Sequence, residues 1–415
     1  MRFALAVLMV CILSFSLAAC SGTQPGSGGS AAGGAGESGS GSGTGTQSTG
    51  KTEKPASYKI GINLELTGGS SVWGVPQKNA VEMLVEELNQ KGGINGVPIE
   101  LVVYDNESSE TQSLVVTKKL VEQDKVLAVI GGGTTPTTMP IVPYMNQQKV
   151  TLVSVGSGDG IVEPASERPY IFKTPVNNNN NAHSIAAFLK EKGKTNVAFM
   201  SMNNAYGEDG RKAFEAVAKE FGLNIVAEEK FGGGDKDMKP QLTKIKAKNP
   251  DAVVVWAIPP SASIVNRNFW ELKLDSMLIY GAGAGSNAFV ELAGSEAAEG
   301  TYMASGKVWV ADQLADSDPQ KELLTKYVKD FESKFKTGVS PIDGMAYDTM
   351  LLLAKAIEMA GDQVNRETIR ENMEKIQNLV GTTGVFNLSP DDHQGLKPED
   401  VIIIQVKGGR WEMAK

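Results

Sequence analysis

Residues 126–142 read Val-Leu-Ala-Val-Ile-Gly-Gly-Gly-Thr-Thr-Pro-Thr-Thr-Met-Pro-Ile-Val, and the organisation of the whole chain can be worked out from this stretch. The apolar run Val126–Ile130 predicts a buried strand. Gly131–Gly133 then allows a tight turn and a close approach of the backbone to a neighbouring group. Thr134 or Thr135 can cap a following helix, and the next residue is a proline, which suits the first helical turn. Free amides and hydroxyls at such a turn favour an anion or a carboxylate.

Two glycine-rich segments invite a nucleotide interpretation, which their spacing does not support. The loop Gly131–Gly133 is not followed by the Gly-Lys-Ser/Thr ending of phosphate-binding loops. The second segment, Gly281–Gly285, does not have the Gly-x-Gly-x-x-Gly spacing of dinucleotide-binding turns. We interpret the second segment as a turn that lets the backbone approach a ligand, and we expect no cofactor.

The composition narrows the class of protein. The chain has 415 residues, which suggests more than one domain, and its 48 acidic against 40 basic residues give a net charge of -8. No basic stripe with interleaved aromatic residues is visible, so we expect no nucleic-acid partner. Both cysteines, Cys11 and Cys20, lie in the first twenty residues, and the two histidines, His183 and His393, are far apart. With so few cysteines and histidines, we expect no metal site. A secreted hydrolase that uses His183 or His393 is the weakest of the alternative functions.

The N-terminal segment predicts export and a lipid anchor. Residues 1–20 carry one positive charge and a short apolar run, which is typical of a secretory signal peptide. Leu17–Cys20 resembles the bacterial lipobox, which implies cleavage before Cys20 and diacylation of its thiol; a plain signal peptide is the alternative. Residues 21–57 are rich in Gly, Ser and Thr and predict a flexible tether. We expect an extracytoplasmic protein anchored to the bacterial cell membrane.

The body of the chain alternates strand and helix patterns. Strands rich in Val, Ile and Leu are separated by amphipathic helices, which is typical of parallel sheets with helices on both faces. Two such series follow each other, and the polar run Asn177–Asn181 between them is interpreted as a hinge or helix entry outside the core. We predict an α/β fold of two lobes, with ligand bound beyond the carboxyl ends of the strands. The predicted strands are Lys59–Leu66, Ile99–Tyr104, Val126–Ile130, Val150–Val155, Pro169–Thr174, Val197–Met202, Asn224–Glu229, Ala252–Ile258, Met277–Tyr280 and Val401–Val406.

Seven short segments, taken in order and spacing, carry a family resemblance. They are Leu66–Gly68, Trp73-Gly74, Gln90–Gly96, Tyr104-Asp105, Val129–Gly131, Ala205–Gly207 and Ala346–Asp348. With them the body resembles the type I periplasmic solute-binding proteins, in particular the branched-chain amino-acid-binding group of ABC importers. The resemblance implies three crossovers between the lobes, with an N-lobe of residues 58–174 and 306–384 and a C-lobe of residues 175–305 and 385–415. It also implies delivery of a small carboxylate ligand to a membrane permease; a ligand-sensing subunit of a signalling receptor is the alternative.

The resemblance further implies which residues contact the ligand. Hydroxyls and amides after the third and fourth strands would hold the carboxylate, an aromatic residue of the first loop would line the cleft, and a tyrosine would close from the C-lobe. Gly158 stands where the group usually has a hydroxyl residue. The implied contacts are Trp73, Thr134, Thr135, Gly156, Ser157, Gly158, Tyr206, Ile258 and Gly283.

The expected partner of an amino group is missing from the sequence. The group has an acidic residue after the strand Met277–Tyr280, whereas this chain has Gly281–Gly285. An unpaired buried ammonium costs several kcal/mol. We therefore expect leucine to bind less well than a carboxylate without the amine. Aromatic acids are among the candidate ligands, because they could stack on Trp73 or Trp256.

Three further residues are interpreted from their surroundings. Trp256 follows three valines and suits the core as well as the cleft. Tyr347 lies on an apolar helix face and is predicted to be core. His393, within Asp391–Gly395, is predicted to lie in a surface turn.

Overall fold

The computed structural model describes residues 54–286 and 288–415. The predicted signal peptide, Cys20 and nearly all of the tether lie outside these residues, so the lipid anchor stays a prediction. Within the described part of the chain, no helix is long and apolar enough to cross a membrane.

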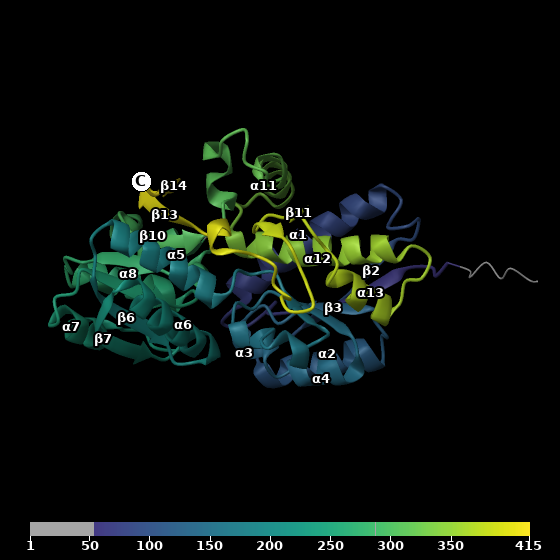
Figure 1. Cartoon of the computed structure of the whole chain (residues 1–415), viewed down its shortest axis with the longest axis horizontal. Coiled ribbons are helices and arrows are strands. Elements are labelled where there is room, and N and C mark those ends of the chain that lie inside the picture. Colours follow the sequence, from purple (N-terminus) through teal and green to yellow (C-terminus); the bar gives the residue numbers. More distant parts are fainter. Residues whose placement is uncertain (1–53, 287) are drawn as a thin grey trace, which may run out of the picture. The chain divides into compact units, whose positions relative to one another are not determined.

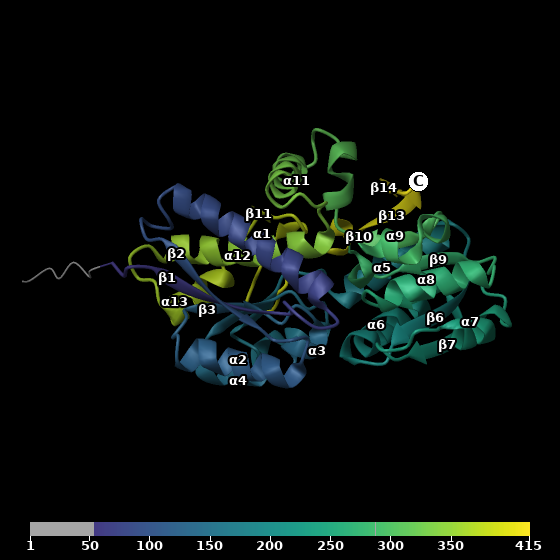
Figure 2. The same ribbon diagram turned by 180° about the vertical axis from the view of Figure 1, so that it is seen from behind.

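The first lobe is built on a five-stranded parallel sheet with the order β2-β1-β3-β4-β5. Helices α1 and α12 pack against each other on one face, and α2 and α4 lie on the other (Figures 1 and 2). The strands are β1 (Tyr58–Leu64), β2 (Ile99–Asp105), β3 (Ala128–Gly131), β4 (Thr151–Ser154) and β5 (Ile171–Lys173). The helices are α1 (Ser71–Gln90), α2 (Glu110–Glu122), α3 (Thr135–Thr138), α4 (Val142–Gln148), α11 (Lys321–Phe335), α12 (Pro341–Ala360) and α13 (Arg366–Met373).

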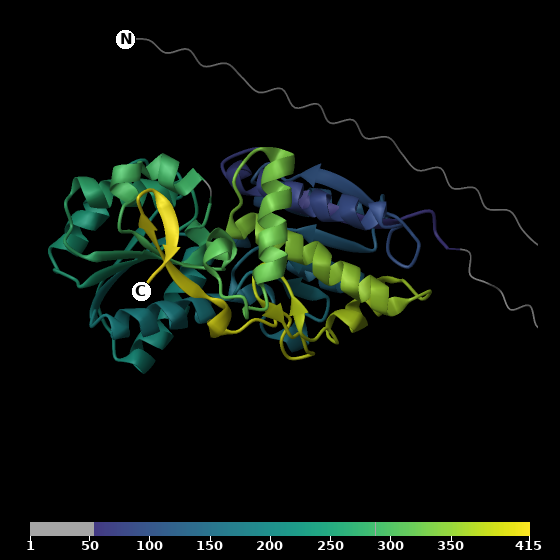
Figure 3. The ribbon, with the colours of Figure 1, turned by 90° about the horizontal axis from the view of Figure 1, so that it is seen from above.

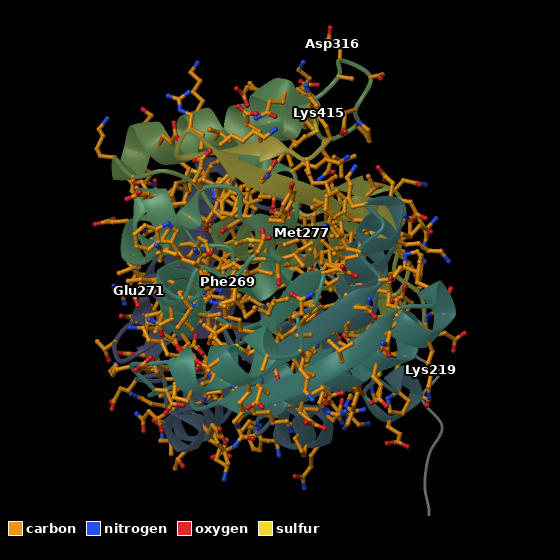
Figure 4. All side chains as sticks on the ribbon, turned by 90° about the vertical axis from the view of Figure 1, so that its left-hand side faces the viewer. Lys219, Phe269, Glu271, Met277, Asp316 and Lys415 are labelled. Carbon is orange, nitrogen blue, oxygen red and sulfur yellow. The ribbon has the colours of Figure 1, made fainter. Side chains whose placement is uncertain are left out.

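The second lobe has a seven-stranded sheet with the order β14-β13-β10-β9-β8-β6-β7. Its strands are β6 (Asn196–Met202), β7 (Asn224–Phe231), β8 (Ala252–Trp256), β9 (Met277–Tyr280), β10 (Tyr302–Ser305), β13 (Ile402–Lys407) and β14 (Arg410–Met413). Its helices are α5 (Asn178–Glu191), α6 (Ala205–Phe221), α7 (Lys239–Lys246), α8 (Ser261–Glu271), α9 (Ala288–Ala293) and α10 (Ser295–Ala298). In Figure 4, Lys219 of α6 and Glu271 of α8 lie on opposite sides of this lobe.

The edge of the second sheet differs from the predicted parallel arrangement. Strand β13 runs antiparallel to β10, and β14 runs antiparallel to β13. Neither β10 nor β14 is among the predicted strands. Trp411 of β14 stacks on Trp309 at a centroid distance of 5.1 Å, which fixes the terminal hairpin.

The chain passes between the two sheets three times, after β5, after β10 and after β12. The last passage follows the small antiparallel pair β11 (Leu379–Val380) and β12 (Val385–Phe386) and is visible as the yellow segment in Figure 3. These passages agree with the predicted crossovers, while the residue limits of the lobes stay a prediction.

The asparagine run forms the start of α5, as expected for a helix entry, but it is largely buried, so its placement outside the core was wrong. Asn177 caps α5 by accepting a hydrogen bond from the amide of Asn180 at 2.7 Å. Asn178 is 1% exposed, and its Oδ1 accepts from Trp256 Nε1 at 3.0 Å. Asn180 Nδ2 donates to the carbonyl of Leu396 at 3.1 Å. Each of the buried side-chain amides has at least one partner, although Asn178 Nδ2 and Asn181 Oδ1 have none among the described residues. These bonds make a polar run compatible with the core.

The surface position predicted for His393 was also wrong. Its ring is 1% exposed and stacks on Phe172 at 4.2 Å, and its Nδ1 lies 2.9 Å from the carbonyl oxygen of Ile171. The turn folds back onto β5, a contact between distant parts of the sequence. Tyr347 is core, as predicted, and Trp256 is fully buried in the core of the second lobe.

Candidate ligand-binding site

The threonines after β3 have different environments. Thr134 is the cap of α3, and its Oγ1 lies 2.9 Å from Thr137 Oγ1 and 3.4 Å from Glu65 Oε1. Thr135 Oγ1 instead accepts a hydrogen bond from the amide of Gly158 at 2.9 Å, and its own proton has no acceptor among the described residues. Thr134 therefore supports the loop from beneath, and Thr135 is the hydroxyl of the pair with a free donor.

A buried carboxyl lies beneath this loop. Glu65 follows β1 and is fully buried, and burial raises the pKa of its carboxyl. A Cβ at Gly133 would collide with Glu65 Oε2 and with Gln77 Oε1 of α1. The glycine at position 133 is therefore required by close packing against these two side chains rather than by a ligand.

The loop after β4 is held by a buried cation. Lys173 of β5 is 0% exposed, and its Nζ donates to the carbonyls of Ser157 at 2.8 Å and Gly158 at 3.4 Å. It also lies 3.3 Å from Asp159 Oδ1. Burial lowers the pKa of Lys173, while Asp159 acts in the opposite direction. This arrangement orients the Ser157–Asp159 backbone.

Two of the predicted amide donors are already engaged within the protein. The amide of Gly156 donates to Ser154 Oγ at 2.9 Å, and the amide of Gly158 donates to Thr135 Oγ1. Helix α3 is a single turn, so its macrodipole is small. The first lobe therefore offers the hydroxyls of Thr135 and Ser157 rather than a row of free amides.

Tyr206 and Gly283 come together in the second lobe. Asn204 caps α6 by accepting from the amide of Gly207 at 3.0 Å, which places Tyr206 in the first helical turn. The hydroxyl of Tyr206 accepts from the amide of Gly283 at 3.2 Å, and a Cβ at Gly283 would collide with it. Burial raises the pKa of this hydroxyl, so it keeps its proton and remains a donor.

Asp209 is a residue that sequence reasoning missed. It lies one turn after Tyr206 on α6, and its Oδ2 would lie 3.8 Å from a Cβ at Gly160 in the first lobe. A Cβ at Gly158 would lie 2.5 Å from Thr135 Cγ2 and 2.9 Å from Asp209 Oδ2. These side chains fill the space that a larger residue at position 158 would need. The i, i+3 spacing from Tyr206 was the available signal.

Trp73 and Ile258 stay predicted contacts. Trp73 lies in the first turn of α1 and is 5% exposed. It belongs to neither of the two clusters of buried hydrophobic residues that include first-lobe strands. Its Nε1 has no hydrogen-bond partner among the described residues. Ile258 is half-buried, after β8. Within residues 54–286 and 288–415, no hydrogen bond links Trp73 to Thr135 or Tyr206, and the hydrocarbon side chain of Ile258 can form none.

A cavity of about 870 Å³ adjoins the place where α6 meets the loop after β4. Its charged lining consists of four carboxylates and one ammonium group, from Asp159, Glu163, Asp209, Asp391 and Lys212. Burial and the neighbouring Asp159 raise the pKa of both Glu163 and Asp209. The charged lining of this cavity is therefore mainly negative, and the cavity is lined by none of the predicted contact residues.

Comparison with known proteins gives the family. A model of the periplasmic binding proteins matches residues 57–410. The chain belongs to the periplasmic binding protein family. The membership confirms the resemblance drawn from the sequence and implies an extracytoplasmic, solute-binding role.

Individual relatives of this periplasmic binding protein are distant but nearly full length. The leucine-, isoleucine-, valine-, threonine-, and alanine-binding protein of Pseudomonas aeruginosa is 24% identical over 350 residues, covering 84% of this chain and 89% of the relative. An extracellular ligand-binding receptor from Rhodopseudomonas palustris HaA2 is 25% identical with a TM-score of 0.81, covering 86% and 100%. The branched-chain amino acid transporter substrate binding protein LivJ of Streptococcus pneumoniae, solved with isoleucine, is 28% identical with a TM-score of 0.77, covering 86% and 99%. These structures confirm the predicted α/β fold class.

The histidines do not resemble a hydrolytic centre. His393 Nε2 lies 3.3 Å from Glu374 Oε1, and His183 packs edge-on against Phe221 at 4.9 Å. Within the described part of the chain, no serine or threonine hydroxyl is hydrogen-bonded to either ring. The relatives are named as solute-binding proteins rather than enzymes.

Proposed function

We propose that this protein is the lipid-anchored solute-binding subunit of an ABC importer and binds a small carboxylate ligand between its lobes. The ligand class is a branched-chain amino acid or a related acid, including aromatic acids. One observation carries the proposal: Thr135 and Gly158 of the first lobe lie against α6 of the second, where Asp209 is the nearest side chain to Gly158. The names of the relatives support the same class of ligand.

Binding proceeds by closure of the two lobes without covalent chemistry. The ligand carboxylate accepts hydrogen bonds from the hydroxyls of Thr135 and Ser157 in the first lobe. Tyr206, supported by Gly283, then approaches from the second lobe, together with the loop after β8. The three chain passages between the sheets form the hinge, and closure creates a joint surface for a permease.

The anchor is proposed from the lipobox-like segment. Two acyl chains on Cys20 would hold the protein stably at the membrane, and residues 21–57 would let the body move beneath it. Replacement of Cys20 by alanine should release the protein from the membrane fraction of expressing bacteria. Retention of the Cys20→Ala protein in that fraction would contradict the anchor.

A thermal-shift screen tests the ligand class. The panel contains α-amino acids, aromatic carboxylic acids, short peptides and urea-type amides. A ligand present at 100 times its Kd stabilises the native state by about 2.7 kcal/mol, which is readily measured. Stabilisation by an amino acid or another carboxylate supports the proposal, and stabilisation only by neutral amides contradicts it.

A further inference from the structure

The carboxyl of Glu65 lies beneath the loop after β3 and is satisfied on one side only. The side chain is 0% exposed. Its Oε1 accepts a hydrogen bond from Thr137 Oγ1, and Thr134 Oγ1 lies 3.4 Å away. These two threonines flank Thr135 in the cap and single turn of α3. The other carboxyl oxygen, Oε2, is buried and has no hydrogen-bond partner among the described residues.

A second buried polar group without a partner adjoins this oxygen. Gln77 of α1 is 0% exposed, and neither its Oε1 nor its Nε2 has a partner within the described part of the chain. A Cβ at Gly133 would lie 2.1 Å from Glu65 Oε2 and 2.6 Å from Gln77 Oε1, so both oxygens border the same small space. Two buried acceptors without a donor are unfavourable. A proton on the carboxyl removes both deficits, because Glu65 can then donate to Gln77 Oε1.

The charges around Glu65 favour the same protonation state. Among residues 54–286 and 288–415, no lysine, arginine or histidine forms an ion pair with its carboxyl, and the groups that most influence its pKa are uncharged. The charged side chain bonded to the same loop is Asp105, which accepts from the amides of Leu66 at 2.9 Å and Thr67 at 3.2 Å. A second negative charge in this loop is disfavoured, and burial raises the pKa of Glu65.

We propose that Glu65 keeps its proton and, as a neutral acid, joins α1 to the loop after β3 and thereby positions Trp73 and Thr135 for the ligand. Gln77 lies one turn after Trp73 on α1, so a hydrogen bond from Glu65 to Gln77 orients that part of the helix. The hydroxyls bonded to Oε1 hold the turn that carries Thr135. This inference rests on the proposed solute-binding function and adds a positioning residue that lies beneath the site.

Difference infrared spectroscopy detects the proton without any ligand, because the C=O stretch of a carboxylic acid is separate from the absorption of carboxylates. The unchanged chain and Glu65→Gln are compared at about pH 8. At that pH, Asp348 and Asp343, whose pKa values burial raises to about 6 and about 7, are mostly ionised. We expect a carboxylic-acid band that the variant lacks. Absence of this band would mean an ionised Glu65 that accepts from Gln77 Nε2, and would overturn the inference.

Substitutions test the positioning role by calorimetric titration with leucine or, if another member of the thermal-shift panel binds more tightly, with that compound. Glu65→Gln keeps a donor and an acceptor, so its Kd should stay within about twofold of the unchanged chain. Glu65→Leu should raise the Kd by about fivefold or more, because Gln77 and the threonines lose their partner. Gln77→Leu should have a similar effect and gives the answer if Glu65→Leu does not fold.

Thr151→Val is the matched control. Thr151 lies at the start of β4, is 0% exposed, and its hydroxyl has no partner among the described residues. The change therefore replaces a buried polar group by an apolar one in the same sheet, away from the loops of the site, and should leave the Kd unchanged.

The remaining outcomes separate this inference from the proposed function. Equal weakening by Glu65→Gln and Glu65→Leu would overturn the role of a neutral donor. An unchanged Kd in folded Glu65→Leu and Gln77→Leu would overturn the positioning role and leave the solute-binding function intact. If no member of the panel binds, the proposed function and the positioning role are both overturned, and the infrared band still decides the protonation state of Glu65.

Discussion

Gly158 illustrates how single residues of the candidate site depend on one another. The sequence comparison marked it as a departure from a group that usually has a hydroxyl residue there. The structure gives a reason, because Thr135 and Asp209 occupy the space around it. In the proposed site, Thr135 of the neighbouring loop would supply the hydroxyl instead.

Gly158→Ala should therefore destabilise the protein. The new Cβ would lie 2.5 Å from Thr135 Cγ2, and overpacking of this kind costs about 1–3 kcal/mol. Chemical denaturation measures the loss. In a Thr135→Ser background the offending methyl group is absent, so at least half of the loss should be recovered. An equal loss in both backgrounds would contradict the packing explanation.

Sequence patterns predicted which loops form the candidate site, but not which side chain of each loop faces which neighbour. The segments at Thr134-Thr135 and Tyr206 were found from spacing and resemblance. Which threonine turns towards Glu65, and which towards Gly158, depends on contacts between distant strands. His393 was misplaced for the same reason, since its partners Phe172 and Glu374 come from other elements.

Among the elements, the loop after β4 belongs to the first lobe and makes hydrogen bonds to the second. Asp159 accepts from the amides of Asn178 at 2.6 Å and Asn179 at 3.2 Å, so a first-lobe carboxylate caps the first helix of the second lobe. Lys173 holds the same carboxylate from beneath. The carboxylate of Asp159 thus has two roles: it places a favourable negative charge at the start of α5, and it forms the ion pair with Lys173.

Lys173→Met should lower the free energy of unfolding by about 3 kcal/mol, because removal of one partner leaves the other charge less compensated. The control is Lys326→Met, which breaks an ion pair with Glu87 in which the lysine is 57% exposed. That change should cost under about 1 kcal/mol. Urea denaturation compares the two variants, and similar losses would contradict the importance of the buried pair.

The N-terminus of α12 should make stability depend on pH. Asp343 is fully buried there and accepts from the amide of Ser340 at 2.7 Å, and burial raises its pKa to about 7 from the ordinary 3.8. Between these values the folded state binds more protons than the unfolded state, so stability falls as pH rises. Compared with Asp343→Asn, the unchanged protein should lose at least about 1.4 kcal/mol from pH 4 to pH 7. Parallel stability profiles for the two proteins would contradict this.

Most strands of both sheets were predictable from sequence, but β10 and the edge strand β14 were not. β8 is a continuous apolar run and β1 carries four apolar side chains, and the predicted limits of both fall within two residues of the observed ones. β10 and β14 are four-residue strands whose pairing depends on neighbours distant in sequence. The burial of the asparagine run was not predicted, because its hydrogen-bond partners Trp256 and Leu396 are distant in sequence.

For the whole molecule, alternating strand and helix patterns predict two α/β lobes, and the family match supports one binding function across both. The sequence could not predict how side chains meet between the lobes. The close approach of Asp209 to Gly158 joins residues from the two lobes, so it depends on the tertiary arrangement.

The central claim is that one small acid is held by both lobes at once. Calorimetric titration of Thr135→Ala and Tyr206→Phe with the tightest ligand of the screen tests it directly. Each variant removes one hydroxyl donor from a different lobe, so each should raise the Kd by about tenfold or more, as expected for a hydrogen bond to a charged group. An unchanged Kd in either variant, with the fold intact, would contradict a ligand site shared between the lobes.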